Sequence, residues 1–446
     1  MPQAVIALEI IYVSLILVSI LFSFSKKIPL LDTLFVVLVL LSPYSISIIP
    51  FRQDTINNYN LYSNYDILNI INFYKVLSLS PLDYLCILIF CKNINQIINT
   101  PKFFLIYFTL ITLVGIISYY ISSIVLWSDE LDNITRIIPT IKPVIYILSL
   151  YSSIFKICKT ISLYNFILLF LSLSSLYFIS SAIILNFLPT WYTWVKYGAN
   201  YLFLDQTDQF IAFLFIVITI FIPIPNKYKI IALIIFSMLI ISGAKAFIYS
   251  LIIIILSYFC KNFNLKISSA MVLFFSAIII SWGLSLVIGI NKWDTSIYTR
   301  YFQVHQLIIN YSSEKILIFF GIGPYKAYRF FAEPELFDSG AYISKELSTM
   351  FRIGFQMPYL SWIKNYGLSG VFFIIISSKY VISHTKKAFS INRNFGALNL
   401  SLGIYFILVC CMDYPAFGIK TLLPIAIYIY MQKMENKHNG INIPKR

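Results

Sequence analysis

Residues 103–127 read FFLIYFTLITLVGIISYYISSIVLW, an unbroken apolar run that contains no charged side chain. Its length matches the ~20 residues that an α-helix needs to cross a ~30 Å hydrocarbon core. In lipid the backbone must satisfy its own hydrogen bonds, so that only helices and closed barrels span a membrane. Because the run is continuous and does not alternate, it predicts a transmembrane helix.

The rest of the chain is also rich in apolar residues and poor in charged ones. Of its 446 residues, 59% are hydrophobic and 11% are charged, whereas about a quarter of the residues of a soluble domain are charged. The sequence therefore predicts an all-α polytopic membrane protein with about 12–13 transmembrane helices. The apolar blocks lie at residues 4–24, 28–50, 80–98, 103–127, 137–157, 163–187, 208–224, 229–243, 246–260, 267–290, 358–380, 395–412 and 415–431.

The net charge of +15 is distributed in a way that indicates membrane topology and argues against nucleic-acid binding. Lysines gather in every second loop, for example Lys261 with Lys266 and Lys386 with Lys387, and acids gather in the intervening loops. This alternation is typical of cytoplasmic loops under the positive-inside rule. We expect the C-terminus inside. The N-terminus lies outside with thirteen crossings, or inside with twelve if the first block is interfacial or two blocks form one broken element.

Outer loops divide the chain. We expect an N-terminal helix bundle at 1–290, a large periplasmic loop at 291–357, and C-terminal helices with a cytoplasmic tail at 358–446. The large loop is partly helical by its pattern, since apolar residues recur at helical spacing over 301–308, ahead of a Gly-Ile-Gly-Pro turn. A second outer loop, 188–207, is rich in tryptophan and tyrosine, which suits an interfacial aromatic belt or stacking on sugar rings.

Five cationic residues on the outer side are candidates for binding an anionic substrate. Arg300, Arg329 and Arg352 share the large loop of a chain that otherwise prefers lysine. A guanidinium binds phosphate or carboxylate through a planar fork of donors, which an ammonium lacks. Lys245 lies close to the hydrocarbon, where a charge is costly and often functional, and Lys196 lies in the aromatic loop. The alternatives are solvated arginines paired with acids of the same loop, and lysines whose stems extend to the membrane surface.

Motifs for nucleotides and metals are missing from the sequence. It has no P-loop, no Gly-x-Gly-x-x-Gly after a strand, no His-Glu-x-x-His and no paired Cys-x-x-Cys. We therefore expect no cofactor and no metal. Any catalysis then uses a pre-activated substrate and works by positioning, acid–base help and anion stabilisation.

The large loop also carries a family resemblance. An arginine opens an amphipathic stretch at 300–309, and an aromatic-led Gly-x-Gly turn follows at 319–324. In this order and spacing the chain resembles the O-antigen polymerase and ligase superfamily. Supporting elements of the same resemblance lie at 205–212, 242–246, 359–360 and 367–370, with Arg329 and Gly340 at a spacing similar to that of polymerase outer loops.

Two departures bear on which branch of the family is closer. The ligase branch has a His-Asn pair, with the histidine as base, where this chain has Gln356 and Met357. Because glutamine does not accept a proton, the polymerase branch is favoured. Lys245 stands where the family has an arginine, which keeps the charge and loses the bidentate geometry.

The resemblance implies a metal-independent glycosyltransferase of the membrane-embedded GT-C type, in the bacterial inner membrane with its active face periplasmic. The donor would be a growing glycan on undecaprenyl diphosphate, the acceptor a sugar hydroxyl of the next lipid-linked repeat unit, and a further partner a chain-length regulator protein. Arg300 and Lys245 would stabilise the leaving diphosphate, assisted by Arg329 or Arg352. Candidates for the base are Glu346, Asp338 and His305.

Three other functions stay open at this point. An O-antigen ligase would use the same fold and donor, with lipid A core as the acceptor. A flippase for lipid-linked oligosaccharides would carry charges inside several helices and short loops on both faces. An accessory subunit of an export assembly would need none of the candidate cations.

Overall fold

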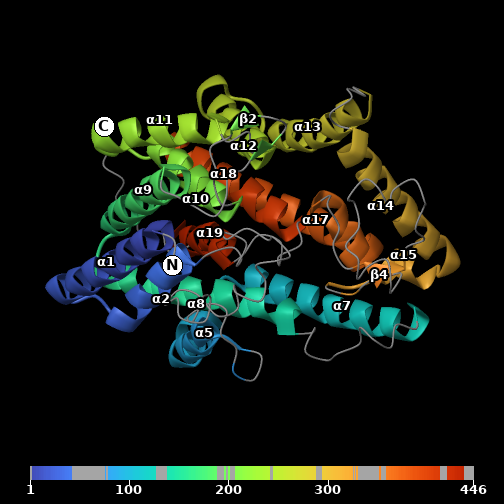
Figure 1. Cartoon of the computed structure of the whole chain (residues 1–446), viewed down its shortest axis with the longest axis horizontal. Helices are drawn as coiled ribbons and strands as arrows, with labels where there is room; N and C mark the ends of the chain where they lie inside the picture. The colour runs from blue at the N-terminus through green and yellow to red at the C-terminus, as the bar shows by residue number, and fades with distance from the viewer. Residues whose placement is uncertain are drawn as a thin grey trace.

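The computed structural model describes residues 3–42, 76, 79–126, 138–187, 195–196, 199–200, 206–241, 245–287, 294–324, 326, 328–329, 351–352, 358–411 and 419–435. Within them the chain is almost wholly helical (Figure 1). The exceptions are two short antiparallel ladders, β1 (Val195–Lys196) with β2 (Ala199–Asn200), and β3 (Tyr328–Arg329) with β4 (Phe351–Arg352).

Among the described residues, five helices contain stretches that are long and apolar enough to cross a membrane, by length and composition. They are α1 (Gln3–Lys26), α7 (Lys102–Leu126), α8 (Ile138–Thr160), α9 (Leu163–Phe187) and α17 (Pro358–Ile391). The coarse prediction of a helical membrane protein is thereby supported. The apolar run that opened the sequence analysis corresponds to α7.

The remaining helices of the described residues are shorter. They are α2 (Leu30–Leu41), α5 (Pro81–Lys92), α6 (Ile94–Ile98), α10 (Gln206–Phe221), α11 (Asn226–Ile241), α12 (Lys245–Phe263), α13 (Ile267–Val287), α14 (Asp294–Ser313), α15 (Ile316–Phe320), α18 (Arg393–Cys411) and α19 (Leu423–Glu435), with a 3₁₀ turn, η7 (Ile419–Leu422). A helix of 13 residues such as α19 rises only about 20 Å, so the count of 12–13 crossings stays a prediction.

The predicted block 358–380 is longer in the structure, where α17 runs to Ile391, and two further predicted helices differ in how they are built. The block 80–98 is not one helix, because α5 ends at Lys92 and α6 begins at Ile94. The buried side chain of Asn93 between them donates to Asp32 Oδ1 at 2.7 Å and to Ser152 Oγ at 3.2 Å. In the described part of the block 415–431, the 3₁₀ turn Ile419–Leu422 precedes a short buried helix, α19.

Ion pairs hold α5 between α2 and α8. Asp32 at the start of α2 is fully buried and accepts from Lys92 Nζ at 3.0 Å, at one end of α5. At the other end Asp83 lies 2.8 Å from Lys142 Nζ of α8 and accepts from the Tyr146 hydroxyl at 2.7 Å. Removing one partner of such a pair leaves an uncompensated buried charge. The pairs therefore fix the position of α5.

The centre of the bundle is the pair α17 and α18, around which α10, α12 and α19 pack. Helices in lipid associate through close packing and interhelical hydrogen bonds, because lipid tails are as apolar as the side chains. Gly403 of α18 lies against Val381 of α17, where an added Cβ would come within 2.5 Å of a valine methyl. Ser401 donates to Ser257 of α12 at 2.8 Å.

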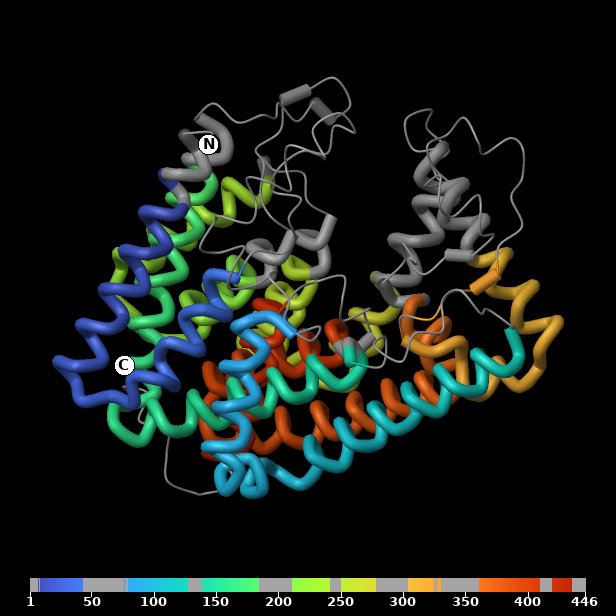
Figure 2. Tube along the Cα trace, turned by 60° about the horizontal axis from the view of Figure 1, so that its bottom comes forward, coloured from blue at the N-terminus to red at the C-terminus, as the bar shows by residue number. Residues whose placement is uncertain are grey.

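The described elements between α13 and α17 lie together at one end of α7 and α17. Figures 1 and 2 show α7 and α17 running side by side, with α14 and α15 at their common end. The helix expected around 301–308 is confirmed as part of α14. This end of the molecule holds the turn at 321–324 and the candidate site.

Candidate functional site

The Gly-Ile-Gly-Pro turn at 321–324 is inserted between α7 and α17. Ile322 donates its backbone N–H to the carbonyl of Lys364 at 2.6 Å, and Gly323 donates to the carbonyl of Asn365 at 3.1 Å. On the other side Ser122 of α7 donates to the carbonyl of Ile322 at 2.6 Å, and Ser118 donates to the carbonyl of Phe320. The turn therefore bridges two membrane helices through its own backbone.

Two glycines, Gly323 in the turn and Gly367 in α17, lie too close to neighbouring backbone atoms for any larger residue. Gly323 has φ +94°, and a Cβ built on it would lie 2.8 Å from the backbone nitrogen of Tyr119. Gly367, with φ +56°, breaks the helical geometry inside α17, and a Cβ there would lie 2.4 Å from the carbonyl oxygen of Ile318. Side chains other than hydrogen are disfavoured at such dihedral angles. The kink leaves the carbonyls of Lys364 and Asn365 accessible to the N–H groups of Ile322 and Gly323.

Lys326 follows the turn and is fully buried. Its Nζ donates to Ser123 Oγ of α7 at 3.0 Å and lies 5.2 Å from the centre of the Tyr119 ring. Burial disfavours the charged form and lowers the pKa of Lys326 to about 8. This lysine therefore changes charge close to neutral pH, in the range where lysines serve in acid–base work.

Lys364 of α17 contacts the same turn through its backbone. It is fully buried, in the candidate span Ser361–Ile391, and its carbonyl accepts from Ile322. A lysine inside an apolar span is costly and for that reason usually functional.

Arg329 is the exposed cation of the group. One of its terminal nitrogens donates to the carbonyl of Leu126 at 2.8 Å, the last residue of α7. A cation in this position also interacts favourably with the negative end of the helix dipole. The bond uses one of the five N–H donors of the guanidinium and fixes the direction of the group.

Asn310 of α14 holds the backbone of Arg329 from the opposite side. Its side-chain amide donates to the carbonyl of Arg329 at 2.7 Å and accepts from the N–H of Arg329 at 3.2 Å. Asn310 is itself buried, and the hydroxyl of its neighbour Tyr311 donates to the carbonyl of Ile363 in α17 at 2.6 Å. These bonds fix the C-terminal half of α14 against β3 and α17.

The ladder of β3 and β4 brings two of the predicted arginines together. Arg329 pairs with Phe351, and Tyr328 pairs with Arg352, so the backbones of Arg329 and Arg352 are neighbours across the ladder. Arg300 and His305 lie on α14, ten and five residues before Asn310. At 1.5 Å per residue these positions are about 15 and 7 Å from Asn310 along the helix. His305 is exposed.

The other predicted site residues are placed in part. Lys245 begins α12, which packs against α18, α13 and α10, and Lys196 lies in β1. The side chains of Lys245, Lys196, Arg300 and Arg352 lie outside the described part of the structure, so the predicted convergence of Lys245 and Arg300 stays a prediction. Glu346 and Asp338, the predicted bases, are outside the described residues.

The sequence analysis missed Lys326, Lys364 and Asn310. A signal for Lys364 was available, because it is a charge within the predicted crossing 358–380. Lys326 stands two residues after the turn, where nothing in the sequence indicates burial. Asn310 acts through contacts between segments that only folding brings together.

Chemically, the group combines the exposed, oriented guanidinium of Arg329 with the buried amine of Lys326, both bonded to the end of α7. Such an arrangement suits an anion with several oxygens, since the guanidinium binds oxygens in pairs and a protonated Lys326 adds a positive potential. Comparison of the chain with protein-family models, with curated proteins and with solved structures finds no match.

Proposed function

We propose that the protein is a membrane glycosyltransferase that polymerises oligosaccharide units carried on undecaprenyl diphosphate, as the sequence resemblance implies. One observation carries the proposal: the side chains of Arg329 and Lys326 are both bonded to the end of α7, beside the turn at 321–324 that joins α7 to α17. This turn is part of the sequence motif on which the resemblance depends.

In the proposed reaction the bond between the anomeric carbon of the growing glycan and the diphosphate oxygen breaks. The hydroxyl oxygen of the acceptor sugar bonds to that carbon and gives its proton to a carboxylate base, for which Glu346 and Asp338 are the candidates, and lipid diphosphate leaves with the electron pair. Arg329, with Arg352 and Arg300, binds the diphosphate oxygens. Lys326 and Lys364 stabilise the negative charge that develops on the leaving diphosphate. Removing one such group typically costs a few kcal/mol of transition-state stabilisation.

The direct test is the polysaccharide pattern of cells that carry Arg329→Ala in place of the wild-type protein. We expect the ladder of polymer lengths to disappear and single units to remain on the acceptor lipid, while Arg329→Lys keeps part of the polymer. Lys315→Ala is the matched control, because it removes an exposed cation of the same loop next to α15 and outside the turn. Blotting of the membranes checks that each variant is present at the wild-type level.

If both Arg329→Ala and Lys326→Met give a normal ladder of polymer lengths, the assignment of the site is wrong. Long polymer that stays on the lipid carrier, above a bare acceptor, identifies a ligase. Carrier-linked units retained in the cytoplasmic leaflet identify a flippase.

A transporter is the second candidate, and one observation favours it. Lys420 in η7 is almost fully buried, and its Nζ donates to the hydroxyl of Tyr177 in α9 at 2.6 Å. With Asp32 on α2, this places charges deep between helices, as substrate or ion pathways require. Lys420→Met separates the two functions, since loss of translocation with normal polymerisation of supplied outward-facing units points to transport.

A further inference from the structure

A second cationic region lies at the other end of α17, away from the turn. It is a pocket of about 400 Å³ between the connection from α12 to α13 and the connection from α17 to α18. Pockets of this volume hold small ligands or headgroups. Its cations are Lys261, Lys266, Lys386 and Arg393.

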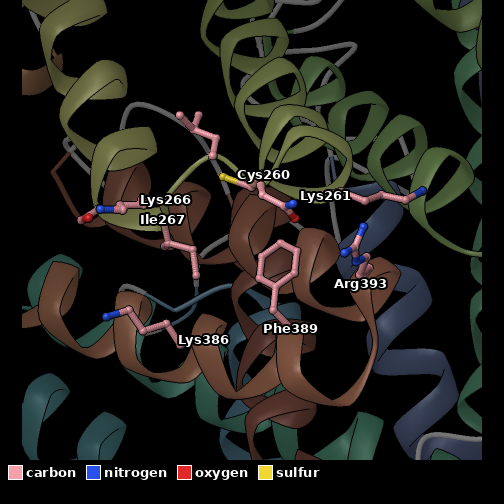
Figure 3. Close-up of a pocket in the computed structure, with 10 residues that line it drawn as sticks. Cys260, Lys261, Lys266, Ile267, Lys386, Phe389 and Arg393 are labelled. Carbon is pink, nitrogen blue, oxygen red and sulfur yellow. The ribbon is translucent and has the colours of Figure 1, made fainter.

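The pocket has a strong excess of positive charge. Figure 3 shows Lys266 and Lys386 on one side of Phe389, and Lys261 and Arg393 on the other. No acidic residue is among the described residues that line it. The ion pairs of Lys92 with Asp32 and of Lys142 with Asp83 lie elsewhere. Four like charges around one hollow repel each other, and a bound anion would relieve this repulsion.

The surroundings of the pocket are apolar and lie at helix ends. The apolar stretches Ser250–Phe263 and Ser361–Ile391 end at the pocket, and Ile267–Ala277 and Arg393–Val409 begin there. Phe263 and Ile391, the last residues of α12 and α17, are 67% and 61% exposed. Apolar side chains open to the surroundings beside a cationic hollow suit a ligand with an anionic head and a hydrocarbon tail. A soluble phosphate would leave these two side chains uncovered.

We propose that this pocket binds the phosphodiester headgroup of an acidic phospholipid, with its acyl chains along Phe263 and Ile391. The charge pattern of the sequence puts both connecting loops on the cytoplasmic side, where anionic headgroups attract basic side chains. Phe389 forms an apolar wall between the two pairs of cations. The site is separate from the outer turn and does not depend on the function proposed for it.

The test uses the full-length protein in detergent, titrated with phosphatidylglycerol or phosphatidylcholine and followed by native mass spectrometry. We expect tighter binding of phosphatidylglycerol to the wild-type protein. The double variant Lys386→Gln/Arg393→Gln loses about thirtyfold in affinity, which corresponds to about 2 kcal/mol for two basic groups. Binding of phosphatidylcholine does not change.

Lys387→Gln is the matched control, because Lys387 is exposed, adjacent in sequence to Lys386 and absent from the lining of the pocket. If the double variant does not fold, Lys266→Gln on the exposed turn after α12 replaces it, with an expected loss of about fivefold. Equal retention of the two lipids by the wild-type protein overturns the proposal. So does an equal loss in the Lys387→Gln control, or complete displacement of phosphatidylglycerol by excess inorganic phosphate, which assigns the pocket to a soluble anion.

Discussion

The turn at 321–324 and the pocket at the α17–α18 connection are both cationic, but their cations are held in opposite ways. At the turn, Lys326 and Lys364 are fully buried, and backbone contacts through glycine fix their surroundings. At the pocket, Lys266, Lys386 and Arg393 are exposed. Burial changes the proton affinity of a lysine and fixes its position, whereas exposure leaves an ordinary, movable charge. The turn therefore suits chemistry on a positioned anion, and the pocket suits binding of a mobile headgroup.

The distance between the two regions fits this division. Past the kink at Gly367, α17 rises about 27 Å from Leu368 to Lys386. The hydrocarbon core of a bilayer is ~30 Å thick. α17 thus carries a buried lysine, Lys364, before its kink and an exposed lysine, Lys386, towards its other end.

Substitution of Gly323 tests how strictly the backbone fixes the turn and has the largest expected effect. Gly323→Ala puts a Cβ 2.8 Å from the backbone of Tyr119, at φ +94°. We expect a loss of about 2–4 kcal/mol of stability, from backbone strain and displacement of α7, together with loss of polymer. Thermal unfolding of the purified variant measures it. A melting temperature equal to that of the wild type shows that the turn is not rigid.

Titration of Lys326 tests whether burial distinguishes the two regions. With a pKa of about 8, Lys326 loses its charge as pH rises through that value, and we expect glycan transfer to fall about tenfold per pH unit above it. Lys326→Arg removes this loss, because a guanidinium stays charged. An unchanged pH profile in Lys326→Arg contradicts the role of Lys326. Rates on purified lipid-linked substrate between pH 7 and about 10 give the comparison.

Stability responds to Lys326 in the opposite direction. The folded protein binds this proton less tightly than the unfolded chain, in which lysine has its ordinary pKa of 10.5. The destabilisation caused by the buried charge is therefore fully present below pH 8. The free energy of unfolding rises as pH increases from about 8 to 10.5. Lys326→Met is expected to melt a few degrees higher than the wild type at pH 7, with the difference shrinking at pH 10. A lower melting temperature at pH 7 means that packing of the lysine stem outweighs its charge.

Asn310 tests whether the position of Arg329 matters as well as its charge. Asn310→Ala removes both amide bonds to the backbone of Arg329, at an expected cost of about 1–3 kcal/mol, and leaves the guanidinium present. We expect about a tenfold lower turnover, with a smaller change in substrate affinity. In Asn310→Asp the acceptor for the N–H of Arg329 remains, and part of the rate returns. An equal loss in both variants shows that the donor bond alone positions the strand.

Substitution of Gly396 has the smallest expected effect on stability and contrasts with substitution of Gly323. A Cβ at Gly396 meets the ring of Phe389 at 2.4 Å, so a side chain and not a backbone is in the way. Gly396→Ala is expected to cost about 1–2 kcal/mol, because Phe389 clears the new Cβ only by a change of its χ1, and to weaken phosphatidylglycerol binding only a few-fold. The same native mass spectrometry titration measures it. A loss as large as that of Gly323→Ala shows that the pocket is as rigid as the turn.

The sequence by itself determined the helical membrane class, because continuous apolar runs and a low content of charge allow no other packing in lipid. It also indicated α14 and the turn, since helical periodicity and a Gly-Ile-Gly-Pro sequence are local signals. Only the tertiary structure decided three other features: the break between helices at Asn93, the burial of Lys326, and the hydrogen bonds of Asn310 to the backbone of Arg329. Each depends on partners about 20 to 200 residues away in the chain, and local pattern carries no information on which distant groups will meet.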